Sequence, residues 1–392
     1  MEIVKYDNNG RGISYLSSRI VFIPNTIIGE DVLIDIVEDK KNYSVGRVLK
    51  FNKISDERVN NICPYYGICG GCDIMHIKYE AQLKYKMNKI KEIMDKFYGE
   101  EIIIKDIIFS KESNYRNKVS LKVENGVGYY KKGTHDFIKI EKCDLLDSHI
   151  NNLIKELNKI DLKDNKNIII RKNTSGLMLV LESMIDYSKI KDLVDVLYVL
   201  NKKIYGKDIY EDLDGLKFII MPSSFFQVNK YNTINLYNKI LEYCDLKGNE
   251  VVLDLYCGTG TIGSFISKKA KKVIGVEINK DSIESANKNK LINELNNIEF
   301  ICGDSGKVLK MSKYKNIDIV IVDPPRSGLD SLAIEELIKI NSKKIIYVSC
   351  DPVTLARDLK VLNSHYKAKE LTPVDMFPST AHVESVVLLE RR

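Results

Sequence analysis

Hydrophobic and polar residues alternate along the first part of the chain, and Gly and Asn interrupt the alternation at short intervals. The pattern runs from residue 10 to residue 51, in GRGISYLSSRIVFIPNTIIGEDVLIDIVEDKKNYSVGRVLKF. A period of two residues between such breaks predicts four or five short strands. Residues 1–55 are therefore expected to form a small OB-like β-barrel, with a generic β module as the alternative.

Residues 56–222 mix helical and strand periodicities. A Lys-rich amphipathic helix is expected to follow the cysteine-containing segment 61–86 and to last until about Phe97. Strands are expected near residues 117–133 and 167–183, a helix near residues 186–203 and a hairpin near residues 208–222. These elements predict a central α+β domain.

From about residue 223 the pattern changes to short, continuously apolar strands separated by helical stretches. The strands are EVVLDLYC, KKVIGVEI, IEFICGD, NIDIVIVDPP, KKIIYVSCD and SVVLLE. Apolar strands of this kind are buried on both faces of a mostly parallel sheet. Residues 223–392 are therefore expected to form a doubly wound, Rossmann-like α/β domain, the third domain of a multidomain chain.

Composition and charge narrow the class of protein. The 392 residues are 44% hydrophobic and 29% charged, which is ordinary for a globular chain, and no apolar run approaches the roughly 20 residues of a membrane span. The first residues, MEIVKYDNNGRG, lack a signal-peptide layout, so a cytoplasmic location and reduced cysteines are expected. No obligate protein partner is evident, and a monomer is expected.

The positive charge is unevenly distributed along the chain. The net charge is +6, and residues 78–142 hold 15 Lys and Arg against 10 Asp and Glu. This surplus suits a polyanion such as RNA, although genome composition can also enrich Lys. Lys78, Lys84 and Lys86 could meet phosphates, with a solvated helix face as the alternative for each.

Three successive strands of the expected C-terminal sheet end in acidic residues. The segment VVLDLYCGTGTIG places Asp254 before a glycine turn, the next strand ends in Glu277, and the third ends at Asp304. Ligands of such sheets bind beyond the strand carboxyl ends. Glu277 could accept hydrogen bonds from ribose hydroxyls, and Asp304 could accept one from an adenine amino group. The set resembles the methyltransferase form of the fold, which binds S-adenosylmethionine.

The next two strands bring a carboxylate and a thiol to the same edge. Asp323 begins the proline-stiffened loop DPPRSG, in which Arg326 replaces the aromatic residue of related loops that serve amine methylation. Cys350 follows in SCDP. A thiolate that adds to uracil C6 makes C5 nucleophilic, and a base must later remove the C5 proton. Glu384 is the candidate base, because the final strand should return beside the fifth. A packing cysteine and a surface acid are the alternatives.

Several motifs together resemble the RNA (uracil-5-)-methyltransferase family, closest to its bacterial 23S rRNA members. They are SFFQVN, DLYCGTGTIG, the strand ending in Glu277, DPPRSG, SCDPVTLARDL and MFPSTAHVESV. The resemblance implies Cys350 as nucleophile and Glu384 as proton acceptor. It also implies an S-adenosylmethionine site lined by Gln227, Tyr256, Thr261, Glu277, Asp304 and Asp323. Thr261 and Asp351 stand where many relatives carry Asn, and both keep polar capacity.

Cys63, Cys69 and Cys72 form C-x5-C-x2-C, and Cys143 can supply a fourth thiolate. Four thiolates suit zinc or a [4Fe-4S] cluster, and the spacing alone does not decide between them. The N-terminal strands resemble the TRAM module, and the ribosomal branch of the resembled family carries a [4Fe-4S] cluster on this spacing. The resemblance therefore implies a structural [4Fe-4S] cluster and 23S rRNA as the substrate.

Two other functions stay open at this point. One is a tRNA uracil-C5 methyltransferase, and the other is a non-catalytic iron-sulfur RNA-binding protein. The remaining cysteines, Cys244, Cys257 and Cys302, are expected to pack in the interior. His76, His135 and His149 are expected to be structural.

Overall fold

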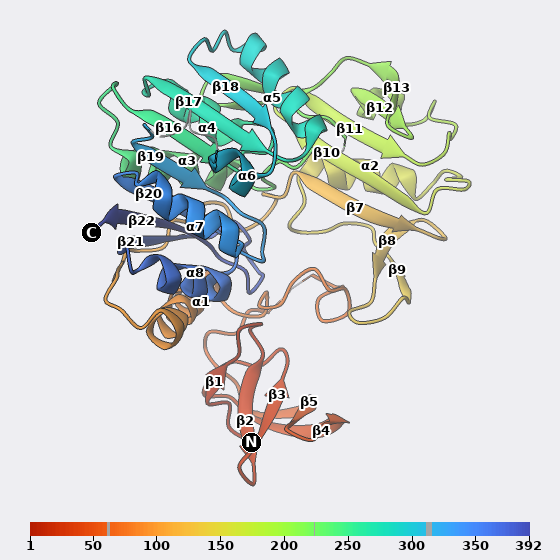
Figure 1. Cartoon of the computed structure of the whole chain (residues 1–392). Helices are drawn as coiled ribbons and strands as arrows, with labels where there is room; N and C mark the ends of the chain where they lie inside the picture. Colours follow the sequence, from red (N-terminus) through yellow and green to blue (C-terminus); the bar gives the residue numbers. More distant parts are fainter. Residues whose placement is uncertain (61–62, 223, 311–315) are drawn as a thin grey trace.

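A computed structural model describes residues 1–60, 63–222, 224–310 and 316–392. Asn61 and Ile62, at the start of the cysteine segment, and Ser223, at the expected start of the third domain, lie outside the described residues. The described residues form sheets of five, seven, two and eight strands. Figure 1 shows the N-terminal sheet projecting below two larger bodies, the C-terminal sheet with its helices and the central sheet.

The N-terminal sheet has five short strands, which agrees with the four or five predicted. In chain order they are β1 (Lys5–Tyr6), β2 (Gly12–Leu16), β3 (Arg19–Ile23), β4 (Asp31–Asp39) and β5 (Tyr43–Lys53). Their order in the sheet is β1-β2-β3-β5-β4, and a bridge between Glu2 and Asp31 connects the chain before β1 to the start of β4. Ile3, Val21, Ile23 and Val32 are buried between these strands.

The segment after the cysteines joins the C-terminal body. Helix α1 (Tyr79–Ile93) continues into a π-helical turn, η1 (Met94–Tyr98), so the helix ends close to the expected residue. Apolar residues of both elements, such as Ile90 and Tyr98, belong to the core of the C-terminal sheet. Strand β6 (Ile103–Ile104) then pairs in parallel with the edge of that sheet.

The central sheet has the order β13-β12-β11-β10-β7-β8-β9. Its strands are β7 (Lys118–Val123), β8 (Val127–Tyr130), β9 (Phe137–Lys139), β10 (Asn167–Asn173), β11 (Gly176–Leu181), β12 (Val196–Val199) and β13 (Lys202–Gly206). Helix α2 (Ser148–Leu157) covers one face, and its apolar residues share a core with β7 and β10.

The helix expected near residues 186–203 is wrong. The segment contains a single 3-10 turn, η2 (Lys191–Leu193), followed by β12 and β13. Val196, Tyr198 and Val199 favour an extended backbone, and β12 pairs in parallel with β11. Leu200 and Asn201 both have positive φ, which is the turn geometry of a tight hairpin.

The expected hairpin near residues 208–222 is confirmed as β14 (Tyr210–Leu213) and β15 (Leu216–Ile219). Asp214 and Gly215 form the turn, both with positive φ. Its apolar residues, including Phe218, pack into the core on one face of the C-terminal sheet.

The C-terminal sheet confirms the doubly wound α/β prediction. Its strands are β16 (Val251–Leu255), β17 (Lys272–Glu277), β18 (Ile298–Cys302), β19 (Ile319–Val322), β20 (Lys344–Ser349), β21 (Tyr366–Val374) and β22 (Glu384–Arg391). They lie with β6 in the order β18-β17-β16-β19-β20-β22-β21-β6. The helices are α3 (Lys230–Cys244), α4 (Thr261–Ser267), α5 (Lys280–Ile292), α6 (Ser305–Leu309), α7 (Ser331–Ile340) and α8 (Pro352–Leu362).

The pairing of the final strand also agrees with the sequence. Strands β16 to β20 pair in parallel where they are neighbours, and β22 returns antiparallel beside β20. Strand β21, which the sequence analysis did not identify, pairs with β22 on its other side.

A buried ion pair fixes the chain that leaves the N-terminal sheet. The carboxylate of Glu30 is fully buried and accepts hydrogen bonds from Nε and Nη2 of Arg58, at 2.7 and 2.6 Å. It also accepts hydrogen bonds from the backbone N–H groups of Ile27 and Ser55. Burial by itself would raise the pKa of Glu30, but these hydrogen bonds more than offset it and leave the pKa below its ordinary value.

Replacing Arg58 by Ala should therefore destabilise the protein, because an unpaired carboxylate stays buried. We expect a loss of about 3 kcal/mol at pH 7, measured by urea unfolding. Since the pKa of Glu30 is lowered, this contribution is present above pH 4.5 and is lost as the pH falls below it. Arg47→Ala is the matched control, because its ion pair with Asp35 is exposed and should be worth less than about 1 kcal/mol. Equal losses for both variants would contradict the prediction.

Candidate functional site

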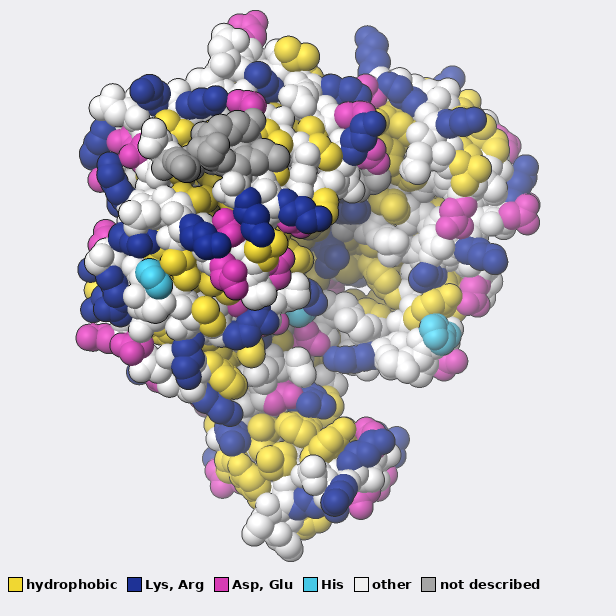
Figure 2. Space-filling model, viewed as in Figure 1, with side chains coloured by type: hydrophobic (Ala, Val, Ile, Leu, Met, Phe, Trp, Pro, Cys, Tyr) yellow, Lys and Arg dark blue, Asp and Glu magenta, His cyan; other side chains and the backbone are white. Residues whose placement is uncertain are grey.

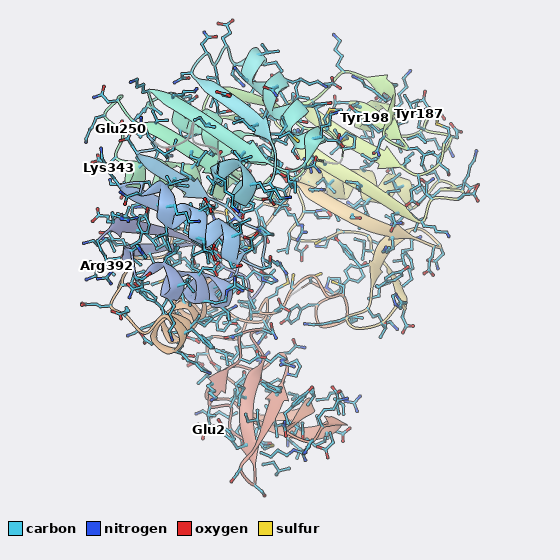
Figure 3. All side chains as sticks on the ribbon, viewed as in Figure 1. Glu2, Tyr187, Tyr198, Glu250, Lys343 and Arg392 are labelled. Carbon is cyan, nitrogen blue, oxygen red and sulfur yellow. The ribbon has the colours of Figure 1, made fainter. Side chains whose placement is uncertain are left out.

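The candidate residues gather at the carboxyl edge of the C-terminal sheet. Glu250 and Lys343 directly precede β16 and β20, and Figure 3 shows both on the outer side of the molecule. The strand arrows in Figure 1 run from there towards the central sheet, to which β12 with Tyr198 belongs. The carboxyl ends of the parallel strands therefore face the middle of the molecule, where ligands of such sheets bind.

Strand register places the candidate nucleophile opposite the candidate base. Ser349, the last residue of β20, pairs with Ser385 of β22. Cys350 follows Ser349 and Glu384 precedes Ser385, so in an antiparallel pair the two face each other across the strand ends. Asp323 comes directly after β19, the other neighbour of β20. The edge thus collects a thiol between two carboxyl groups.

This arrangement disfavours ionisation of all three groups. Burial and, to a smaller extent, the charges of Glu384 and Asp323 raise the pKa of the Cys350 thiol to about 11, against a lowering effect of Arg326. Burial and the neighbouring Asp323 likewise raise the pKa of Glu384 well above its ordinary value. The Glu384 side chain is 3% exposed. A buried carboxyl group with a raised pKa is suited to moving a proton near neutral pH.

A second buried carboxyl group lies below the glycine turn. Burial raises the pKa of Asp254 to about 8, and the charge of Asp323 contributes to this shift. Its Oδ2 accepts a hydrogen bond of 2.9 Å from the backbone N–H of Gly263. Its Oδ1 is buried and has no hydrogen-bond partner within the described residues. An unsatisfied buried oxygen of this kind is costly unless a ligand or water binds it.

Two glycines explain the close packing of this turn. Gly260 has a φ of 75°, and a Cβ atom there would collide with the ring of Phe300. A Cβ atom at Gly263 would lie 2.9 Å from Oδ2 of Asp254. The first glycine permits a left-handed backbone, and the second lets the start of α4 approach the carboxylate.

Glu277 and Asp304 stand at the ends of the next two strands, as expected. Oε1 of Glu277 accepts a hydrogen bond of 2.8 Å from the Asn279 N–H, and Oε2 accepts one of 3.2 Å from the Gly258 N–H. Asp304 caps α6, and its Oδ1 accepts a hydrogen bond from the Lys307 N–H. Backbone groups thus orient both carboxylates, and neither Glu277 nor Asp304 is fully buried.

The other three predicted ligand residues come from separate segments. Tyr256 follows β16 with a φ of 61° and is half-buried. Thr261 begins α4, and its Oγ1 lies 2.7 Å from the hydroxyl of Tyr237 on α3. Gln227 is buried before α3, and its backbone oxygen accepts a hydrogen bond from the Asn117 side chain. These contacts position the three residues.

Asp358 was missed by the sequence analysis, although it lies within the quoted motif SCDPVTLARDL. It is fully buried on α8, where Oδ2 accepts hydrogen bonds from the Leu329 N–H and the Tyr347 hydroxyl, at 2.8 and 2.7 Å. The neighbouring Arg357 donates a hydrogen bond to the Ser327 oxygen. Both side chains hold the loop that begins at Asp323. The available signal was an acid on the apolar face of a helix.

The four predicted metal ligands line one cavity of about 200 Å³. Cys63, Cys69 and Cys72 come from the loop before α1, and Cys143 comes from the chain before α2, where the Asn151 amide bonds both its N–H and its oxygen. All four thiols are free and half-buried. Within the described ranges, no group of three or more His, Cys, Asp and Glu side chains has the arrangement to hold a single metal ion.

Two expectations about single side chains need correction. Lys86 meets neither phosphate nor solvent, because it is fully buried in an ion pair with Asp375. Cys302 is exposed rather than packed, since it ends the edge strand β18, whereas Cys244 and Cys257 are buried as expected.

His76 is structural, as expected. Its ring is buried between the Tyr66 hydroxyl and the Thr26 oxygen, and burial lowers its pKa to about 4.

The surface around the site is basic in part. Figure 2 shows a face hollowed between the C-terminal body and the central body, with Lys and Arg side chains in and around the hollow. Among the helices that the structure describes, none is both long and apolar enough to span a membrane.

Comparisons with known proteins identify the class to which this fold and site belong. The family described as tRNA (Uracil-5-)-methyltransferase matches residues 212–392. An uncharacterized RNA methyltransferase of Clostridium tetani is 38% identical over 97% of this chain and 93% of its own length. One of Staphylococcus aureus is 36% identical over 98% of this chain and 96% of its own length.

A solved structure covers the same extent. The Pyrococcus abyssi tRNA (uracil-54, C5)-methyltransferase in complex with S-adenosyl-L-homocysteine has a TM-score of 0.83 and 28% identity, over 99% of both chains. The chain therefore belongs to the RNA (uracil-5-)-methyltransferase family. It is an S-adenosylmethionine-dependent RNA methyltransferase, as the sequence motifs predict.

The raised pKa of Cys350 makes its alkylation strongly dependent on pH. We expect the rate of carboxyamidomethylation of Cys350 by iodoacetamide, followed by peptide mass spectrometry, to rise with a midpoint near pH 11. In Glu384→Gln the midpoint should fall, because a negative neighbour that raises the pKa is removed. Cys244 in the same digest is the internal control, and a shift of its profile or an unchanged Cys350 profile would contradict this account.

Proposed function

We propose that this enzyme methylates C5 of a uracil in structured RNA through a covalent intermediate with Cys350, and that Glu384 removes the C5 proton. The observation that carries the proposal is the register of β20 and β22, which sets the thiol opposite the buried carboxyl group. A uracil bound between them would offer C6 to the thiol. Its C5 would lie close to the base.

S-adenosylmethionine supplies the methyl group. The Cys350 thiolate would form a bond to C6, and the electron pair of the C5–C6 double bond would move into the ring. C5 would then take the methyl group, whose bond to the donor sulfur breaks and leaves its electron pair on that sulfur as S-adenosylhomocysteine departs. Glu384 then takes the proton from C5, and elimination breaks the C6–S bond and returns the thiolate. Because the pKa of Glu384 is raised, the protonated carboxyl group that this step produces is favoured. Glu384 must be ionised before it takes the proton.

The donor site is proposed at the carboxyl ends of β16, β17 and β18. Glu277 would accept hydrogen bonds from the ribose, and Asp304 would accept one from the adenine amino group. Gln227, Tyr256, Thr261 and Asp323 would complete the lining. The unpaired Oδ1 of Asp254 supports a ligand at this position, because a donor group on the ligand would satisfy it.

The RNA target has two candidates. The first candidate is 23S rRNA, which the resemblance of the cysteine set and the N-terminal strands to the ribosomal branch supports. The Pyrococcus abyssi relative, which acts on tRNA, matches this chain over 99% of its length, N-terminal sheet and cysteine region included. This likeness makes tRNA the second candidate. The N-terminal sheet and the cysteine region do not by themselves distinguish an enzyme that acts on rRNA from one that acts on tRNA.

The four-cysteine site is proposed to bind a [4Fe-4S] cluster, with zinc as the alternative. Four thiols on one cavity provide a ligand set for either. A four-iron cluster separates its ligands more widely than one ion does, which agrees better with a cavity than with a compact ion site. We also propose that residues 1–55 form a TRAM-like RNA-binding domain. Residues 56–222 would form the central domain and residues 223–392 the methyltransferase domain. The enzyme would act in the cytoplasm as a monomer.

Methylation assays should separate the targets and the mechanism. Wild-type protein with labelled S-adenosylmethionine should methylate unmodified 23S rRNA at uracil C5, read by mapping 5-methyluridine. Label in tRNA alone would overturn the rRNA proposal. RNA that contains 5-fluorouracil should give a complex stable to denaturant, because the fluorine at C5 cannot be removed as a proton. Cys350→Ala should form none, and a complex that persists in this variant would contradict the assigned nucleophile.

Protein purified without oxygen should show the absorbance of a [4Fe-4S] cluster and four irons per chain by elemental analysis. Zinc in place of iron would select the alternative metal. Cys143→Ser should lower the metal content, whereas Cys244→Ser should not, because Cys244 is buried in the C-terminal core. Equal metal content in both variants would exclude the four-cysteine site.

A further inference from the structure

The candidate base stands at the end of a loop that leaves and re-enters the sheet at one point. Val374, the last residue of β21, pairs with Glu384, the first residue of β22. The intervening residues form the loop 375–383. The position of Glu384 along the strand end therefore depends on how this loop is held.

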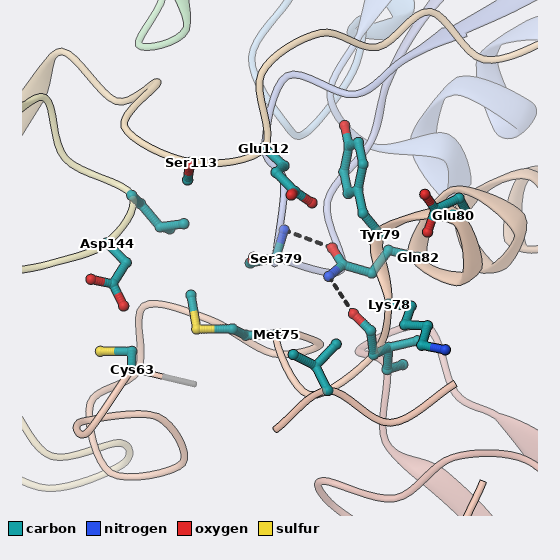
Figure 4. A pocket seen from close by; sticks show the side chains of 13 residues that line it. Cys63, Met75, Lys78, Tyr79, Glu80, Gln82, Glu112, Ser113, Asp144 and Ser379 are labelled. Carbon is teal, nitrogen blue, oxygen red and sulfur yellow. Dashed lines mark hydrogen bonds between the residues drawn. The ribbon is translucent and has the colours of Figure 1, made fainter. Parts of the chain in front are cut away.

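The loop 375–383 is held by the segment from the cysteines to α1. The Ser379 oxygen accepts hydrogen bonds from the backbone N–H groups of Asp73 and Ile74, at 3.0 and 3.1 Å. The Ser379 N–H donates a hydrogen bond of 2.9 Å to Oε1 of Gln82, and Nε2 of Gln82 donates one to the Ile77 oxygen (Figure 4). Ser379 has a φ of 66°, so these contacts hold a left-handed backbone in place.

A buried ion pair anchors the first part of the loop. Nζ of Lys86 lies 2.5 Å from Oδ1 of Asp375, and both side chains are fully buried. The same ammonium donates a hydrogen bond of 2.9 Å to the Phe377 oxygen. Oδ2 of Asp375 accepts a hydrogen bond of 2.8 Å from the Tyr79 hydroxyl. One lysine on α1 thus binds both a side chain and a backbone oxygen of the loop.

Two further hydrogen bonds hold later backbone oxygens of the loop. Nζ of Lys89, one turn after Lys86, donates a hydrogen bond of 2.7 Å to the Ala381 oxygen. The Tyr115 hydroxyl donates one of 3.1 Å to the Pro378 oxygen. Beside these contacts lies a cavity of about 460 Å³, with Cys63 on one side and Ser379 on the other (Figure 4).

We propose that Lys86 and Asp375 are positioning residues for proton removal: the buried pair holds the loop 375–383 so that Glu384 faces C5 of the covalently bound uracil. This inference rests on the proposed function. Cys350 directly follows β20 and reaches C6 without help from the loop, and only the later step uses Glu384. Loss of the pair should therefore affect one step of the reaction and leave the earlier steps intact.

Lys86→Met tests this, because Met keeps most of the apolar stem and removes the ammonium. With 5-fluorouracil RNA the variant should form the covalent complex at close to the wild-type rate, since no proton is removed there. With ordinary RNA its turnover should fall roughly tenfold or more, because a positioned base is worth roughly 10²–10⁴-fold in rate. The methylated covalent complex should accumulate during turnover, with KM for RNA unchanged.

Lys91→Met is the matched control, because Lys91 lies on the exposed face of the same helix, and it should behave as wild type in all three measurements. Binding of S-adenosylmethionine, by calorimetry, reports whether each variant is folded. If Lys86→Met does not fold, the double variant Lys86→Met with Asp375→Asn is used in its place. The double variant leaves no unpaired charge buried.

Two outcomes would overturn the inference. One is wild-type turnover in a folded Lys86 variant, and the other is an equal loss of turnover and of 5-fluorouracil complex formation. Failure of the wild-type protein to form the complex at all would instead refute the proposed function. The two failures are therefore distinguishable in one set of assays.

Discussion

The antiparallel pairing of β22 with β20 is the constraint on which the site depends. Parallel strands bring their carboxyl ends to one edge, and the pairing of Ser349 with Ser385 adds the beginning of the last strand to that edge. Because side chains alternate along strands, a slip of one residue would turn Glu384 away from the thiol. The apolar residues of β22 are buried between the two cores of the sheet, which keeps the register.

Burial of several carboxyl groups at this edge disfavours their ionisation. Asp254, Asp323 and Glu384 are acids in a poorly solvated region, and burial raises the pKa of each. Like charges nearby cannot all ionise together, so protons are shared among them near neutral pH. Such a store of exchangeable protons suits the proposed mechanism, in which a thiolate is first generated and a proton is later accepted.

Much of this molecule was predictable from the sequence, and the exceptions have physical reasons. Continuous apolar strands identified β16 to β20 and β22, because a buried sheet leaves little else at those positions. Strand β21 was missed although Tyr366 and Ala368 are buried and Lys367 and Lys369 are exposed, an alternation interrupted by a bulge after Ala368. The helix assigned near residues 186–203 failed because periodicity is ambiguous in short apolar runs, and pairing with β11 decided the outcome.

The positions of the candidate residues at the edge of the sheet were predictable from the sequence, but the residues that hold them there were not. Cys350 follows the end of an apolar strand and Glu384 begins one, and the local sequence pattern shows both strands. Lys86 meets Asp375, and Asp73 meets Ser379, across most of the chain, and no local signal in either segment reveals the other. The sequence predicted Lys86 on the surface, because its helix is rich in Lys. Only the packing of α1 against the C-terminal body buries it.

That packing has a consequence for the order in which the protein can form during synthesis. The second half of helix α1, with Ile90 and Ile93, shares a core with α8, so this part of its apolar side lacks those partners until residues 352–362 have left the ribosome. At roughly 5–20 residues per second, this leaves the helix waiting for tens of seconds. The apolar residues in the second half of α1 thus stay without their final partners on the nascent chain for this time. A C-terminal fragment that begins after the central sheet would lack both this helix and the edge strand β6.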